Sequence, residues 1–372
     1  MMMLSKKIRL IPTPLQEHQL WKSVGTARFI YNWTLARQEE NYKLGNKFIS
    51  DNNLRKEITQ LKKDELKWLS EVSNNIAKQA VKDACNAYKK FFKGLADKPR
   101  FKNRKRSKKS FYNDNIKLKV KNNKSVLIEK VGWIKTAEQL PMSVKYTNPR
   151  VTFDNKYWYI SVSIEQEEKQ IELTDVSLGI DLGVSELAIC SDGKRYKNIN
   201  KTKTVRKIEK KMRRLQRQVS RKYEKGKRGE TFAKTSNILK IEKKVQLLHR
   251  RLANIRKNHT HQTTAEIVKT KPLRIVIEDL NVSGMMKNKH LSKAIAGQGF
   301  YEFRRQLRYK CELNGIELVA ADRFYPSSKT CSECGKINKN LKLSDRIYKC
   351  TCGLSIDRDL NASINLANYE LA

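Results

Sequence analysis

Four of the seven cysteines lie within 22 residues of one another, in the last fifth of the sequence. They form a Cys331-x-x-Cys334 pair and, after a spacer of fifteen residues, a Cys350-x-Cys352 pair. Two thiolate pairs on tight turns are typical of a tetrahedral Zn²⁺ site, and a glycine beside each pair permits such turns. Four thiolates leave no coordination position for water, so the sequence predicts one structural zinc ion. Redox-active or unliganded thiols are the alternative.

Three apolar runs typical of strands contain carboxylates that are far apart in the chain. They are Leu178–Val184 with Asp181, Leu273–Leu280 with Glu278, and Leu354–Ala362 with Asp357 and Asp359. Separations of 97 and 81 residues mean that only a folded sheet brings these acids together. Carboxylate oxygens on rigid elements suit two Mg²⁺ ions roughly 4 Å apart, which promote phosphodiester cleavage. A cap or an arginine partner is the plainer interpretation of each acid alone, and metal-free paired acids also fit the count.

The charge balance indicates the kind of partner. The chain has 79 Lys and Arg against 38 Asp and Glu, a net charge of +41. So large an excess repels itself in a compact state, which predicts a polyanion as partner. The basic residues are spread along the chain among Tyr, Phe and Trp, a pattern that favours nucleic acid over a membrane surface. Composition alone equally fits a structural nucleic-acid protein.

The length of 372 residues predicts two or three domains. No apolar run approaches the roughly 18 residues that span a bilayer, and the segment Met1–Lys7 becomes charged before any run of signal-peptide length. We therefore expect a cytosolic protein without a membrane partner. The isolated Cys85, Cys190 and Cys311 are expected to be small buried apolar groups.

The first half of the chain predicts a helical segment inserted into a small β domain. Residues 1–12 alternate as a strand, and Thr13-Pro14 then resembles a helix N-cap followed by proline in the first turn. Helical periodicity covers 13–95 in three segments, the first with an apolar stripe that starts at Leu15, and short alternating strands fill 112–167. The lone first strand is expected to join the later sheet.

Between these parts, eight of the twelve residues in 98–109 are basic and none is acidic. Such a run is often a solvated loop, but in this chain we expect it to contact phosphate. The candidate contacts are Arg100, Arg104, Lys105 and Arg106.

A second basic segment covers residues 201–257, with 22 Lys or Arg against four Glu. Apolar residues recur at helical spacing from Val205 to Val219 and from Ile238 to Ile255, which predicts a helical hairpin turning at 226–229. An ordinary solvated coiled-coil hairpin is the alternative, but a surface of one sign repels itself unless it lies on phosphates. The predicted contacts are Lys210, Lys211, Arg213, Arg214 and Arg217.

With these residues in place, the chain resembles the TnpB family, transposon-encoded RNA-guided nucleases related to type V CRISPR effectors. The resemblance extends over nearly the whole chain. It is carried by 26–33 (TARFIYNW), 179–183 (GIDLG), 277–280 (IEDL), 325–335 (YPSSKTCSECG) and 357–362 (DRDLNA). The last two motifs are highly specific.

The resemblance implies a fold that mixes α/β and α+β domains. It implies an RNase H-like RuvC nuclease domain at 171–325 and 354–372, with the zinc ribbon inserted at 326–353. A small β-barrel-like wedge domain would occupy 1–12 and 112–170, with a helical recognition insertion at 13–111. The metal ligands would be Asp181, Glu278 and Asp359, and Asp357 would be a neighbour.

The implied function is cleavage of double-stranded DNA beside a short adjacent motif, in the prokaryotic cytosol or nucleoid. A transposon-derived guide RNA, the omega-RNA, would select the target by base pairing, and two Mg²⁺ ions would support hydrolysis. Two other hypotheses remain open at this point. One is a nuclease-inactive guided DNA-binding repressor, and the other is an RNA-independent RuvC-like resolvase or transposase.

Overall fold

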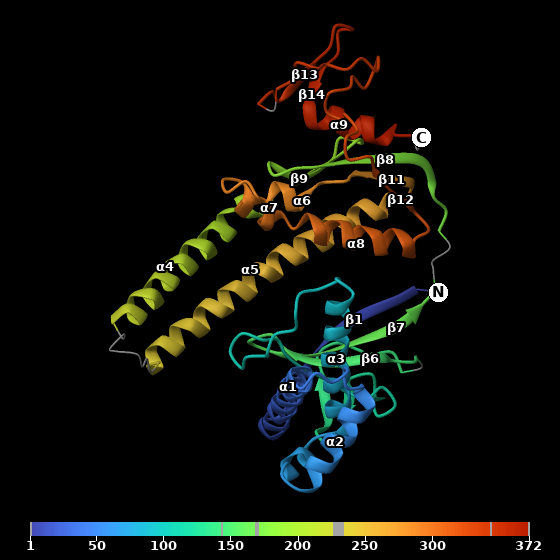
Figure 1. Cartoon of the computed structure of the whole chain (residues 1–372). Coiled ribbons are helices and arrows are strands. Elements are labelled where there is room, and N and C mark those ends of the chain that lie inside the picture. Colours follow the sequence, from blue (N-terminus) through green and yellow to red (C-terminus); the bar gives the residue numbers. More distant parts are fainter. Residues whose placement is uncertain (1, 143, 168–170, 226–233, 343, 371–372) are drawn as a thin grey trace. The chain divides into compact units, whose positions relative to one another are not determined.

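The computed structural model describes residues 2–142, 144–167, 171–225, 234–342 and 344–370 (Figure 1). The chain divides into two compact units, Met1–Gln166 and Glu167–Ala372. No helix in these described ranges is long and apolar enough to cross a membrane.

The first unit contains a seven-stranded sheet in the order β2-β6-β7-β1-β5-β4-β3. Strand β1 (Met2–Ile11) pairs antiparallel with β7 (Trp158–Gln166) and, at Leu10 and Ile11, with β5 (Gly132–Thr136). The prediction that the first strand joins the later sheet is therefore confirmed. The predicted start of the β segment at 112 is late, because β2 begins at Lys109. The remaining strands are β2 (Lys109–Tyr112), β3 (Lys119–Lys121), β4 (Ser125–Ile128) and β6 (Thr147–Phe153).

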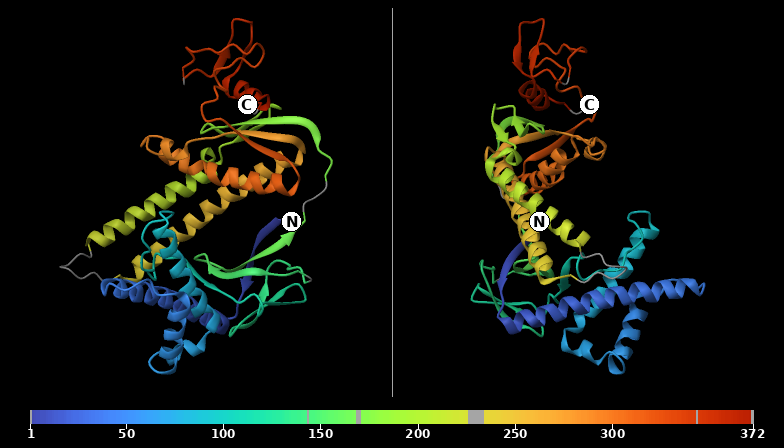
Figure 2. Two further views of the ribbon diagram at one scale, coloured as in Figure 1. Left: turned by 45° about the vertical axis from the view of Figure 1, so that its right-hand side comes forward. Right: turned by 90° about the vertical axis from the view of Figure 1, so that its left-hand side faces the viewer.

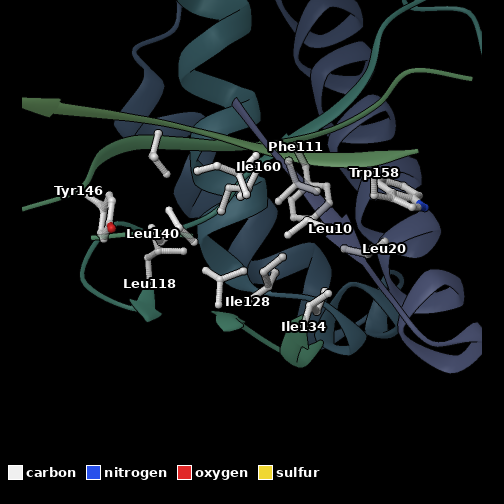
Figure 3. Close-up of a cluster of buried hydrophobic side chains, with 14 of the residues drawn as sticks. Leu10, Leu20, Phe111, Leu118, Ile128, Ile134, Leu140, Tyr146, Trp158 and Ile160 are labelled. Atoms are coloured by element: carbon white, nitrogen blue, oxygen red, sulfur yellow. The ribbon is translucent and has the colours of Figure 1, made fainter. Parts of the chain in front are cut away.

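One hydrophobic core joins the two halves of this sheet (Figure 3). Phe111 and Ile160 come from one half, Ile128 and Ile134 from the other, and all four side chains are buried. The buried Leu10 of β1 belongs to the same cluster. Strand β1 therefore holds the halves together through both its hydrogen bonds and its apolar face.

Three helices follow β1, as the periodicity predicts. They are α1 (Pro14–Lys43), α2 (Asp51–Lys63) and α3 (Asn74–Phe92), with a short 3₁₀ helix η1 (Lys67–Glu71) before α3. The predicted Thr13 cap is present: its hydroxyl accepts from Gln16 N, and the Gln16 side chain accepts from Thr13 N. The start of the predicted apolar stripe is wrong, because Leu15 is 81% exposed. The buried part of the stripe begins at Leu20.

The second unit is built on a five-stranded sheet in the order β10-β9-β8-β11-β12. Strands β8, β9 and β10 are antiparallel, whereas β11 runs parallel to both β8 and β12. Strands β9 and β10 form a hairpin whose turn contains Gly193 at φ +83°. The strands are β8 (Thr174–Leu182), β9 (Glu186–Cys190), β10 (Arg195–Lys197), β11 (Pro272–Glu278) and β12 (Glu317–Ala321).

Helices α4 (Lys203–Lys225) and α5 (Ser236–Lys269) lie side by side as the predicted hairpin (Figure 2). Val205, Ile208 and Leu252 are buried in their seam. Helix α5 extends twelve residues past the predicted end at 257, and the predicted turn at 226–229 lies outside the described residues. A short 3₁₀ helix η2 (Ile199–Lys201) precedes α4, and α6 (Val282–Met285), α7 (Ser292–Gln298) and α8 (Phe300–Leu313) follow β11.

The cysteine segment carries the antiparallel pair β13 (Ile347–Lys349) and β14 (Ser355–Asp357), which leads directly into α9 (Arg358–Ala367). The prediction of one strand-like run over 354–362 is therefore wrong after Asp357. The Asp357 carboxylate accepts hydrogen bonds from the backbone N–H groups of Asp359 and Leu360, which caps α9. The alternation of apolar and polar residues over a few positions is the same for a short strand and for this capped helix start.

Candidate functional site

Asp181 and Glu278 lie at the carboxyl ends of neighbouring parallel strands. Strands β8 and β11 are in register with Ile180 opposite Ile277, so the next residue of each strand is the acid. Both strands are apolar because the sheet buries them, with Ile180 and Ile277 fully enclosed. The register of the sheet thus brings together two carboxylates that are 97 residues apart in sequence.

Asp359 reaches the same end of the sheet from the first turn of α9. This helix packs on β8, β9 and β11, and Gly179 of β8 permits the close approach. A Cβ atom at Gly179 would overlap the Ser363 carbonyl oxygen and the Ala367 nitrogen. Glycine at this position is therefore required by packing, and its backbone conformation is ordinary.

The electrostatics show that the three acids act on one another. Burial raises the pKa of Asp181 well above its ordinary value, and the charges of Glu278 and Asp359 raise it further. Burial also raises the pKa of Glu278, a hydrogen bond from Ser327 opposes this rise, and Asp359 adds to it. Adjacent arginines offset the repulsion only in part: Asp359 lies 3.4 Å from Arg358 Nη2 and 3.8 Å from Arg346 Nη1.

These carboxylates have the character of a site for hard cations. Three mutually repelling oxygen donors in a partly buried position are stabilised when a divalent cation neutralises them. The carboxylates do not converge as tightly as the cysteines. In the described part of the chain, the cysteines are the group of three or more ligating side chains whose donor atoms all lie within 4.8 Å. Two cations need not share every carboxylate oxygen.

Glu278, which the sequence analysis selects, and its neighbour Asp279 have different partners in the structure. Glu278 Oε1 accepts a hydrogen bond from Ser327 Oγ at 2.7 Å, whereas Asp279 binds two arginines. Hydrogen bonds from Arg304 and Arg323 lower the pKa of Asp279. Sequence reasoning missed Ser327, although it lies in the Pro-Ser-Ser-Lys-Thr-Cys motif that preceded the first cysteine pair.

The four cysteines do form one cluster, as the spacing predicts. Cys331 Sγ lies 3.6 Å from Cys352 Sγ, and Cys334 Sγ lies 3.6 Å from Cys350 Sγ. A tetrahedron with Zn–S bonds of about 2.3 Å has edges of about 3.8 Å, so the donor set fits Zn²⁺. The single-residue spacer of the second pair is accommodated by Gly353, which has φ +100°. Cys85, Cys190 and Cys311 are buried apart from this cluster.

The basic candidates are exposed. Lys210, Lys211, Arg213, Arg214 and Arg217 are exposed side chains of α4, whereas the seam residues Ile208 and Leu215 of the same helix are buried. None of the five is in an ion pair with another described residue. Their guanidinium and ammonium groups are therefore available to an anionic partner.

The basic segment at 98–109 is anchored rather than wholly solvated. Arg100, Arg104, Lys105 and Arg106 are exposed. Between them, Lys102 exchanges two backbone hydrogen bonds with the Asn32 side chain, at 2.7 and 3.0 Å. Its ammonium group lies 3.5 Å from the centre of the Tyr31 ring. The four exposed side chains thus extend from a segment that is fixed on α1.

Comparison with known proteins identifies the family. The chain is 33% identical over 378 residues to the protein of Escherichia coli K12 named "Putative RNA-guided DNA endonuclease InsQ", covering 97% of this chain and 90% of that protein. The chain belongs to the TnpB/OrfB_IS605 family. A "Putative RNA-guided DNA endonuclease" of Streptomyces pristinaespiralis is 32% identical and covers 98% of this chain and 89% of its own length. The resemblance inferred from the motifs is confirmed.

Family models match three parts of the chain. Residues 159–289 match the model described as a probable transposase, 300–366 match the Cas12f1-like TNB domain, and 1–47 match a helix-turn-helix domain. Among solved structures, a complex of Cas12f1 with sgRNA and target DNA has a TM-score of 0.59 at 16% identity, covering 95% of this chain and 82% of that chain. This TnpB chain therefore shares the mixed α/β multidomain fold of Cas12f1.

Proposed function

We propose that this TnpB chain is a transposon-encoded endonuclease that cleaves double-stranded DNA under the direction of a guide RNA. The observation that carries the proposal is the position of Asp181 and Glu278 on neighbouring parallel strands, with Asp359 near enough for its charge to raise the pKa of both. The first two side chains are coupled through space by the register of β8 and β11. The names of the relatives support the guided reaction, and the Cas12f1 complex contains both sgRNA and target DNA.

The proposed fold of the reacting part is an RNase H-like RuvC domain formed by 171–325 and 354–372. Its mixed five-stranded sheet, with acids at adjacent strand ends, supports this assignment. The ribbon would occupy 326–353. In the first unit, the sheet of 1–12 and 112–170 would form the wedge domain, and 13–111 the recognition insertion. These parts would bind guide RNA and read the motif beside the target.

The three acids would hold two Mg²⁺ ions, which supply an activated water and stabilise the leaving oxygen when bound. The chain's own groups prepare this site. Asp181 and Glu278 are only partly exposed to solvent, and the Ser327 hydroxyl donates a hydrogen bond to one oxygen of Glu278. Asp357 caps α9 and so fixes the backbone that carries Asp359. Arg346 and Arg358 lie beside the Asp359 carboxylate as positively charged partners.

The test uses the full chain bound to the RNA that copurifies with it. Asp181→Asn should abolish cleavage of a matched plasmid in Mg²⁺, while binding of the same target remains within about twofold, because a neutral isostere leaves the basic surfaces unchanged. Asp192→Asn is the matched control, since this acid pairs with Lys194 in the β9–β10 turn. It should cleave normally.

Three outcomes decide between this function and its rivals. Binding without cleavage by the unaltered complex would favour a guided repressor. Cleavage of branched DNA by RNase-treated protein, with no RNA recovered, would favour a resolvase or transposase. Cleavage that survives in pure Asp181→Asn protein would refute the assignment of the site.

A further inference from the structure

Two surface depressions beside Glu278 are lined by two arginines and two exposed aromatic rings. The proposed role of the three acids gives these four side chains no function. Asp279 Oδ1 accepts from Arg304 Nη1 at 2.8 Å, and Asp279 Oδ2 accepts from Arg323 Nη2 at 2.5 Å and Nε at 3.1 Å. Arg304 lies on α8 and Arg323 in the segment after β12. One carboxylate thus fixes two guanidinium groups from separate elements, and one positive charge remains in excess.

The arginines keep hydrogen-bonding capacity for another group. Each guanidinium has five N–H donors, of which Asp279 takes one from Arg304 and two from Arg323. Their side chains are 35% and 51% exposed. Arginine donates two parallel hydrogen bonds to a phosphate, so a fixed and exposed pair suits a phosphodiester.

Two depressions share Arg323, with volumes of about 390 and 260 Å³, and Arg304 lines the smaller one. Both are lined by Glu278, Leu280, Asn281 and Arg323. Phe324 borders the first and Tyr301 the second, and these rings are 88% and 77% exposed. Aromatic rings so exposed have little packing of their own, and bases of unpaired strands stack on such rings.

We infer that these groups bind the unpaired strand on either side of the phosphate to be cleaved. Arg304 and Arg323 would bind a phosphate next to the one at Glu278, while Phe324 and Tyr301 stack the flanking bases. A paired base already stacks within its duplex, so this surface selects a single strand. The inference rests on the proposed function, because it takes Glu278 as part of the site of cleavage.

The first experiment measures binding and does not require cleavage. The RNA-bound Asp181→Asn protein is mixed with a short single-stranded oligodeoxynucleotide containing 5-iodouracil and is irradiated. The crosslinked residue is then identified by mass spectrometry. Crosslinks at Phe324 or Tyr301 are expected. Crosslinks confined to other parts of the chain would overturn the inference even if the proposed function holds.

The second experiment measures affinity for the same oligonucleotide. Phe324→Ala should weaken binding about fivefold or more, as loss of one stacked base does. Phe324→Trp should restore it. Leu273→Ala is the control, because Leu273 is an exposed residue at the opposite end of β11. Since Phe324 contributes almost nothing to the core, an unfolded variant is not expected, and a melting curve checks this.

The third experiment uses the salt dependence of binding. Arg304→Gln and Arg323→Gln should each reduce the slope of log K against log salt by about 0.7, the value for one lost phosphate contact on a single strand. Glutamine removes the positive charge and keeps a polar amide group at each position. Arg305→Gln is the matched control, because this neighbour of Arg304 pairs with Glu302. Unchanged slopes in the two test variants, or an equal loss in the control, would refute the arginine assignment.

Discussion

Ser327 donates a hydrogen bond to Glu278 across 2.7 Å, from a loop 49 residues further along the chain. The donor is itself fixed, because Asn365 of α9 donates to the Ser327 carbonyl at 2.7 Å. Two hydrogen bonds in series therefore link helix α9 to the Glu278 carboxylate through Ser327. A shift of α9 should move this carboxylate.

We expect Ser327→Ala to slow cleavage about tenfold or more at saturating Mg²⁺, because a hydrogen bond to a charged group contributes about 1.5–3 kcal/mol. Single-turnover cleavage rates measure the effect. Ser328→Ala, one residue along the same loop, should cleave at the normal rate. Equal rates for both variants would mean that the Ser327 hydroxyl does not position Glu278.

Gly179→Ala should destabilise the second unit by about 1–3 kcal/mol, because its Cβ overlaps the backbone of α9 and core overpacking has this cost. Displacement of α9 also moves Asp359, so cleavage should fall with stability. Urea unfolding measures the first effect. Gly183→Ala is the comparison, since its Cβ would lie 3.3 Å from the Glu186 carbonyl and needs only a small adjustment. A similar loss in both variants would argue against the close contact.

The Glu302 carboxylate makes the free energy of unfolding depend on pH in the acidic range. Hydrogen bonds from Arg305 and Gln306 lower the pKa of Glu302 from 4.5 to about 2, against the opposing effect of burial. A lowered carboxyl pKa stabilises the fold above pH 4.5, and this contribution disappears as pH falls toward 2. Because Arg305 is 48% exposed, solvent limits the contribution to about 1 kcal/mol.

Glu302→Gln should therefore lower the free energy of unfolding by about that amount at pH 7, and the difference from the unaltered protein should narrow below pH 4.5. Urea unfolding between pH 7 and pH 3 checks this. Glu312→Gln, an exposed acid near the end of α8, should show no such pH dependence. A constant difference across this range would disprove the linkage to Glu302.

The cysteine cluster should hold one zinc ion per chain, measured by elemental analysis of protein purified without chelator. Cys334→Ser should lose the zinc, because a tetrahedral site requires all four donors. Cleavage should also fall, since Arg358 N donates to the Arg346 carbonyl at the join of the ribbon and α9. Ser332→Ala, between two of the ligands, should retain zinc. Zinc-free unaltered protein would refute the site.

Neutralising Lys210, Lys211, Arg213, Arg214 and Arg217 with glutamine should flatten the salt dependence of nucleic-acid binding. The slope should fall by about 0.9 for each lost duplex phosphate contact. Lys210→Arg with Lys211→Arg preserves charge and should leave the slope unchanged. If the glutamine variant keeps the full slope, α4 presents a solvated face instead.

The sequence by itself determined the features that depend on neighbours along the chain. The cysteine spacing predicts the four-cysteine cluster, and the Thr13-Pro14 pair predicts the start of α1. The 3.6-residue periodicity predicts the α4–α5 hairpin. These are local relationships, set by backbone geometry and side-chain type. The motif at 179–183 contains Asp181. The family resemblance that this motif helps to carry is confirmed by the comparisons.

The tertiary structure alone decided how distant groups meet. The register of β8 and β11 brings Asp181 and Glu278 to neighbouring strand ends. Asp279, the next residue, pairs with Arg304 and Arg323 instead. The spacing of these residues along the chain does not reveal either arrangement. Asp359 proved to lie on a capped helix because Asp357 accepts two backbone hydrogen bonds. Helix α9 approaches β8 at Gly179, and Ser327 reaches Glu278, through packing between segments far apart in sequence. Such contacts depend on shape complementarity across the whole core.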